Sequence, residues 1–337
     1  MARADWDNFE TSWDFRDLPL LRPELKAGTL AASWQNWKAH CDAAIRRMQE
    51  LETENNRLFI EAYGLQDELS PEVPEDQITL ARANVSIDIA AFLSYAVGCM
   101  MGRYSLDKPG LILADAGDTL ANYLAKVGKP IEKLRFSPDE DGVIPMLDGE
   151  WFEDDVVERA REFLRVTFGK ATLSENLRFI EESLGKDLRK YFLTDFYKNH
   201  ISNERAYGYK KRPIYWLVQS PQKGFNALIY LHRYTRDTMN IVLNRYLRPY
   251  QEKLRNRLSI LAQTQISGNT RDKTAARKET DKLTRILREC EEWERQTLLP
   301  LAQARIELDL DDGVKVNYQK LGEALAPIPG LAKNDEE

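Results

Sequence analysis

The chain has 337 residues, a net charge of −6 and 43% hydrophobic residues. That length predicts one large domain or two ordinary ones, and that composition excludes a wholly disordered chain. No apolar run approaches the ~20 residues that cross a bilayer, and the N-terminus lacks an apolar signal region, so we expect a cytoplasmic protein. Three separated cysteines fit reduced thiols, and three histidines are too few for a histidine-rich metal site.

Charge is unevenly distributed along the chain. Residues 51–160 contain 22 acidic and 9 basic residues, a net of −13, whereas residues 201–260 contain 12 basic and 3 acidic residues, a net of +9. A local basic cluster can bind a polyanion even when the whole chain is negative.

The first two hundred residues read as mostly helical. Prolines interrupt an aromatic opening segment, and a helix is predicted from an N-cap at Thr29 to about Tyr63, where Gly64 can end it. A second helix near 83–104 is apolar nearly all round, as in a buried core helix. A short helix is predicted over 115–127 in a loop-rich stretch. Three more helices are predicted over 152–206, with a capping box at Thr172–Glu175.

The later part of the chain contains the one predicted strand pair. Residues 213–219 and 227–234 are rich in β-branched and aromatic side chains, and they flank the turn-forming segment 220–224. Helical spacing returns after Thr235. It predicts two long antiparallel helices, with a bend at Pro249, a turn at 268–269 and a kink at Pro300.

The predicted fold class is therefore mainly α: a multi-helix assembly with one small β-hairpin and a long C-terminal antiparallel helical hairpin. We expect five parts in chain order. They are an irregular aromatic docking segment at 1–28, a helical domain at 29–206, a basic β-hairpin plus helix at 207–266, a C-terminal helical arm at 267–330, and a disordered tail at 331–337.

The basic cluster around the predicted hairpin is the main candidate binding surface. Long cationic side chains on a fixed surface suit DNA phosphates, and nearby tyrosines could stack or simply pack. The alternative is a solvated face that neutralises the acidic first half of the chain. The candidate nucleic-acid-binding residues are Lys210, Lys211, Arg212, Lys223, Arg233, Arg236, Arg245 and Arg248.

Enzymatic signatures are weak in this sequence. It has no P-loop, no Gly-x-Ser-x-Gly elbow and no Cys-x-x-Cys pair. Asp17 with Glu24 and Lys26 has nuclease-like spacing but lies among prolines, where no paired strand is evident. The acidic run from Asp139 to Asp155 could bind a hard cation, although such a run is more often a solvated loop. We therefore assign no catalytic, cofactor-binding or metal-binding residues.

Several stretches resemble the C-terminal region of PglX, the adenine-specific DNA methyltransferases of the BREX phage-defence systems. Combined restriction–modification enzymes share parts of these stretches. The resemblance rests on residues 2–15, 55–69, 94–110, 211–216, 224–234 and 310–318.

The resemblance implies a complete enzyme that methylates adenine with S-adenosylmethionine. This chain lacks the Asn-Pro-Pro-Tyr motif and the glycine-rich cofactor loop, so no catalytic or cofactor residue is carried over and whether it is itself an enzyme stays open. We expect a non-catalytic module that positions double-stranded DNA and docks onto the methyltransferase domain of the same enzyme, with other phage-defence proteins as further partners. The alternative is a protein-interaction scaffold within a defence complex that does not contact DNA.

Overall fold

The computed structural model describes residues 1–202, 209, 212–329 and 331, and most of them are helical. The candidates Lys210 and Lys211 therefore lie outside the described residues, as does the predicted tail apart from Leu331. The chain divides into two compact units. Unit 1 comprises Met1–Tyr95 and Leu164–Lys186, and unit 2 comprises Ala96–Phe163 and Asp187–Glu337. The predicted five-part division stays a prediction.

Unit 1 is organised around one long helix. Helix α2 begins after Thr29, whose hydroxyl accepts a hydrogen bond from the Ala32 amide at 3.2 Å, and ends at Gly64 with φ +70°. Both caps are those predicted, because a glycine without Cβ adopts this left-handed conformation freely. The helices of this unit are α1 (Ala2–Trp6), α2 (Leu30–Tyr63) and α6 (Leu173–Leu184).

The aromatic opening segment is only partly packed. Phe15 is buried edge-on against Tyr95, with ring centroids 6.0 Å apart, whereas Trp13 is almost fully exposed. The predicted capping box at Thr172 is wrong, because the Thr172 hydroxyl donates to the Phe168 carbonyl at 2.9 Å and does not cap α6.

Two helices contain residues of both units: α3 (Val85–Met100) and α5 (Val156–Phe168). Helix α3 is the predicted apolar helix, and most of its side chains are buried. Among the described residues, no helix is both long and apolar enough to span a membrane.

Unit 2 contains a small antiparallel sheet. The predicted hairpin is confirmed as β2 (Tyr215–Gln219) and β3 (Asn226–Tyr230), paired from Tyr215↔Tyr230 to Gln219↔Asn226. A third strand, β1 (Val143–Pro145), pairs with the other edge of β3, so the order is β1-β3-β2. Strand β1 was not predicted, because three residues in a loop-rich stretch show no alternation of apolar and polar side chains.

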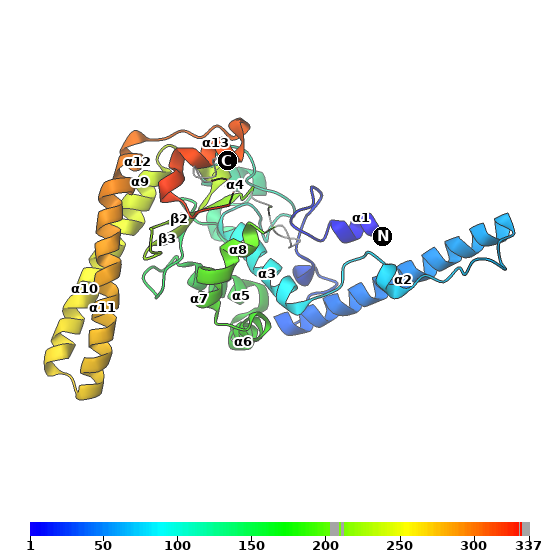
Figure 1. The fold of residues 1–337 in the computed structure, drawn as a ribbon, viewed down its shortest axis with the longest axis horizontal. Helices are drawn as coiled ribbons and strands as arrows, with labels where there is room; N and C mark the ends of the chain where they lie inside the picture. Colours follow the sequence, from blue (N-terminus) through cyan, green and yellow to red (C-terminus); the bar gives the residue numbers. More distant parts are fainter. Residues whose placement is uncertain (203–208, 210–211, 330, 332–337) are drawn as a thin grey trace. The chain divides into compact units, whose positions relative to one another are not determined.

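The remaining helices of unit 2 are short, apart from two long antiparallel ones that form the predicted helical hairpin (Figure 1). The chain continues through a π-helical turn before Pro249 and another before Pro300, because proline lacks the amide that an α-helical hydrogen bond needs. These helices are α4 (Leu120–Val127), α7 (Leu188–Tyr191), α8 (Tyr197–His200), α9 (Thr238–Ile241), α10 (Arg248–Ser267), α11 (Thr270–Trp293), α12 (Leu299–Ala304) and α13 (Gly313–Leu321).

Candidate nucleic-acid interface

The β2–β3 hairpin holds two exposed cations at its opposite ends. Arg212 lies three residues before the start of β2, and its amide donates to the Tyr209 carbonyl at 2.8 Å. Lys223 lies in the turn with φ +64°. A five-residue strand spans roughly 17 Å, so the two side chains mark separate points, as predicted.

The turn that carries Lys223 is anchored. The Lys223 amide donates to the Ser220 carbonyl at 2.9 Å, and the Phe225 amide donates to the Ser220 hydroxyl at 2.9 Å. The Gln222 amide also donates to the Glu289 carboxylate of α11 at 2.6 Å. A turn fixed at both its base and its tip holds the Lys223 backbone in place without further ligands.

Arg212 and Lys223 differ from the other candidates in one respect. Among the described residues, neither has a carboxylate within ion-pair distance, and both are exposed. No carboxylate in the described part of the chain therefore competes with a phosphate for these two charges.

Arg233 is placed differently. Its guanidinium is buried and donates to the main-chain carbonyls of Asp139 and Glu140 at 2.8 and 2.7 Å. Burial lowers the pKa of this guanidinium, although the nearby carboxylates of Asp139 and Asp141 act in the opposite direction. Arg233 holds the loop before β1 and does not reach the surface, so we leave it out of the candidate interface.

The three remaining arginines are exposed and ion-paired. Arg236 pairs with Glu307. Arg245 pairs with Asp141 at 2.9 Å, and this hydrogen bond raises the arginine pKa. Arg248 pairs with Glu294 at 2.8 Å. Their side chains remain about half exposed, so solvent and ligands can reach them.

Arg248 also lines an open groove between α10 and α11. The groove has a volume of about 670 Å³, and it alternates arginines with glutamates. Arg255 pairs with Glu291 at 2.6 Å across it. The residues that line it are Asn244, Arg248, Pro249, Gln251, Glu252, Arg255, Glu291, Glu294 and Arg295.

The acidic run near β1 is occupied by internal contacts. Asp139 accepts a hydrogen bond from the Gly142 amide at 2.6 Å, and burial together with Asp141 raises its pKa. The Tyr246 hydroxyl lies 3.0 Å from Asp154 and 3.2 Å from Asp141. Across the described ranges, no group of three or more acidic, histidine or cysteine side chains is arranged to hold a metal ion.

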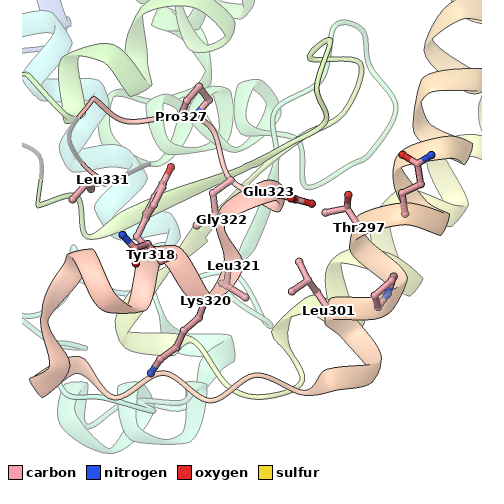
Figure 2. A pocket seen from close by; sticks show the side chains of 13 residues that line it. Thr297, Leu301, Tyr318, Lys320, Leu321, Gly322, Glu323, Pro327 and Leu331 are labelled. Carbon is pink, nitrogen blue, oxygen red and sulfur yellow. The ribbon is translucent and has the colours of Figure 1, made fainter. Parts of the chain in front are cut away.

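A separate pocket of about 460 Å³ lies between α12 and α13 (Figure 2). Thr297 and Glu323 point toward one another across it, while Leu301 and Leu321 supply apolar walls. The Tyr318 hydroxyl already donates to the Ala326 carbonyl. We assign no ligand to this pocket.

Comparison with known proteins identifies the class of enzyme to which the chain is related. No protein-family model matches the chain. An adenine-specific methyltransferase PglX from Lacticaseibacillus casei (strain Zhang) is 39% identical over 334 residues, which is 95% of this chain and 26% of the relative. The adenine-specific methyltransferase BrxX from Escherichia coli O9:H4 (strain HS) is 33% identical over an alignment of 366 positions, covering 100% of this chain and 29% of the relative.

These relatives confirm the resemblance that the sequence predicts, over essentially the whole chain. The chain spans little more than a quarter of their length.

Proposed function

We propose that this chain, related over its length to part of the adenine-specific methyltransferases PglX and BrxX, positions double-stranded DNA for methylation carried out elsewhere in the complete enzyme. One observation carries the proposal. Arg212 and Lys223 are exposed at opposite ends of an anchored hairpin, and neither has a carboxylate partner among the described residues. Fixed cations of this kind contact phosphates and set the position of a protein on DNA.

The spacing of these cations favours DNA over a single small anion. Side chains separated by the length of a five-residue strand reach different phosphates along a groove edge, whereas one bound anion would need converging cations. Contacts to phosphates carry no base information, so binding through this surface should depend weakly on sequence.

The ion-paired arginines extend the same surface. The pair of Arg236 with Glu307 is exposed on both sides and contributes only about 0–1 kcal/mol, so a phosphate can replace this carboxylate at small cost. The side chains of Asp141 and Glu294 are only 7% and 14% exposed, so Arg245 and Arg248 would leave a largely buried carboxylate behind and exchange partners less readily. Arg236, Arg245 and Arg248 therefore become secondary contacts, weaker than Arg212 and Lys223. Lys210 and Lys211 remain contacts proposed from the sequence alone.

S-adenosylmethionine would be held by another part of the complete enzyme. The described strands form an antiparallel sheet, and none leads through a glycine-rich loop into a helix. The described residues therefore do not fit this cofactor. We propose the methyltransferase domain as the docking partner and other phage-defence proteins as further partners.

The test is duplex binding measured over a range of salt concentrations, with this chain and with the complete enzyme. Changing Arg212 and Lys223 together to Gln should lower the log–log salt slope by roughly 1.8 and the affinity roughly fiftyfold at 0.1 M salt, because each lost phosphate contact removes roughly 0.9 from the slope. The matched control changes Arg46 and Lys170, exposed cations of unit 1, to Gln and should bind like the wild type.

Unchanged affinity and slope in both proteins would overturn the proposal. The pairing of Arg236, Arg245 and Arg248 with internal carboxylates would then be their whole role, and the chain would be a protein-interaction scaffold.

A further inference from the structure

The far half of α2 carries a row of exposed apolar side chains. Leu51, Leu58, Phe59 and Tyr63 are 41%, 55%, 57% and 75% exposed. Successive residues of an α-helix are about 100° apart, so Leu51 and Leu58 lie on one line, and Phe59 and Tyr63 extend this apolar row over about 140° of the helix surface. Single exposed apolar residues are ordinary, but contiguous rows mark interaction sites.

The rest of unit 1 packs on α2 mainly before Leu51 and along an adjoining side of its far half. The segment that follows α2 runs back along it (Figure 1). Ile45 clusters there with Val73, Ile78 and Leu80, and the side-chain amide of Asn56 donates to the Pro71 carbonyl at 3.3 Å. The return segment covers Ile45 and contacts Asn56, but it leaves the four side chains of the apolar row at least 41% exposed.

The row lies in a strongly acidic setting. Residues 50–76 contain nine Asp and Glu and one Arg, a net charge of −8. The single cation, Arg57, is already paired with Glu54 at 2.6 Å and Glu61 at 3.7 Å. An open groove of about 680 Å³ beside the helix is lined in part by Glu50, Glu54 and Glu72.

We propose that residues 50–76, the α2 arm, are a docking surface for a partner protein that presents apolar side chains flanked by Lys and Arg, in the manner of a basic amphipathic helix. Apolar contact with the row supplies affinity, and charge complementarity with the carboxylates supplies specificity and association rate. DNA and anionic membranes are repelled by the same charge. A second copy would bring two faces of charge −8 together. The proposal does not depend on DNA binding by unit 2.

The test uses the whole chain and a defined probe: a synthetic amphipathic peptide with leucines on one face and lysines on its flanks, followed by fluorescence anisotropy. Changing Leu58 and Phe59 together to Ser should weaken binding at least tenfold, because each exposed side chain gains apolar contact on docking. Changing Glu50, Glu54 and Glu72 to Gln should also weaken binding, and the difference should shrink at high salt.

The chain offers a matched control for the apolar substitutions. Ile260 on α10 is 53% exposed, so Ile260→Ser removes a similar side chain from unit 2 and should leave peptide binding unchanged. A peptide of the same composition in scrambled order should bind at least tenfold more weakly. Leu58 and Phe59 are more than half exposed, so the variant that changes both to Ser should melt at the wild-type temperature. If it melts at a lower temperature, Tyr63→Ser, at a side chain that is 75% exposed, provides the second test.

Two outcomes would overturn the proposal. If the Leu58 and Phe59 variant binds the peptide as the wild type does, the lysines alone hold it and the row is not a docking surface. If sedimentation shows self-association at micromolar concentration that the same variant abolishes, the occupant is a second copy of the chain.

Discussion

Two long helical segments of this chain bury their apolar faces in different ways. The α10–α11 arm, residues 248–293, packs helix against helix and buries Leu254, Leu261 and Leu283. The α2 arm is one helix backed by an extended return segment, which covers only one side. Leu58 and Phe59 stay exposed there.

The same two arms also differ in net charge and in how many of their charged side chains are paired. The α10–α11 arm has 11 basic and 7 acidic residues, a net of +4, and pairs them across its helices, as in Arg255–Glu291 and Arg257–Glu279. The α2 arm has one cation for nine carboxylates. In the α10–α11 arm, the seam of leucines between the two helices is buried and charges are paired across it, so the arm leaves little apolar surface for a partner. The α2 arm instead exposes an apolar row among carboxylates, which is the composition of a surface that binds a basic partner.

The largest expected effect compares a buried leucine between α10 and α11 with an exposed leucine of the α2 row. Leu254→Ala should lower the free energy of unfolding by about 2–5 kcal/mol, because it leaves a cavity in the α10–α11 seam. Leu58→Ala removes an equal side chain from the exposed row and should change it by no more than about 0.5 kcal/mol. Denaturant titration measures both, and equal losses would contradict the comparison.

The second prediction compares the three cations that precede the hairpin with two ion-paired arginines. Changing Lys210, Lys211 and Arg212 together to Ala should reduce the salt slope of duplex binding by roughly 2.7, if each contacts one phosphate. Changing Arg245 and Arg248 should reduce it by less than roughly 1.8, because each must first leave its carboxylate partner. A larger change for the paired residues would mean that the helix, rather than the hairpin, carries the interface.

Local signals in the sequence were sufficient for much of the fold. Thr29 and Gly64 fixed both ends of α2, since a hydroxyl N-cap and a left-handed glycine act on the adjacent turn alone. The β-hairpin could be predicted because two segments rich in β-branched and aromatic residues flank the turn-forming residues Ser220–Gly224. The α10–α11 arm followed from leucines at helical spacing.

Features that depend on distant residues could not be predicted in the same way. Strand β1 exists because Val143 pairs with Ile229, far along the chain. In the sequence, Arg233 cannot be told from the exposed arginines near it. In the structure its guanidinium is buried and donates to the main-chain carbonyls of Asp139 and Glu140. The ion pair of Arg245 with Asp141 likewise joins segments about a hundred residues apart, so a count of basic residues overstated the free positive charge.

The third prediction concerns Asp88, a partly buried carboxyl group on α3 that contacts the first turns of α2. The Asp88 carboxylate accepts a hydrogen bond from the Trp34 indole at 2.9 Å, but burial raises the Asp88 pKa to about 6. The unfolded value is about 3.9, so the fold favours the protonated form. The resulting stability is fully present below pH ~4 and is lost as pH rises through about 6.

Asp88→Asn should remove this dependence. Relative to the variant, the wild type should lose about 2 kcal/mol between pH 4 and pH 7 in urea titrations. Asp67→Asn, at the exposed end of the α2 arm, is the control and should leave the pH dependence as in the wild type. A parallel profile for wild type and Asp88→Asn would show that the carboxyl titrates at its ordinary value.

The smallest effect compares one thiol from each long helical segment. Cys41 on α2 and Cys290 on α11 are both buried, and burial is the main cause that raises each pKa to about 12. At pH 8 about one thiol in ten thousand would be ionised, and the thiolate is the reactive form. Native protein should therefore resist a disulfide reagent, while all three cysteines react in urea.

Slow labelling of the native protein then reports local opening of each helix. Cys290 lies in the sealed α10–α11 seam, whereas α2 relies on an extended segment for its cover, so Cys41 should label first. Peptide mapping after timed labelling separates the two sites, and Leu254→Ala should speed Cys290 alone by loosening its seam. If Cys290 labels before Cys41 in the wild type, the α10–α11 arm is the less stable of the two, and the comparison is reversed.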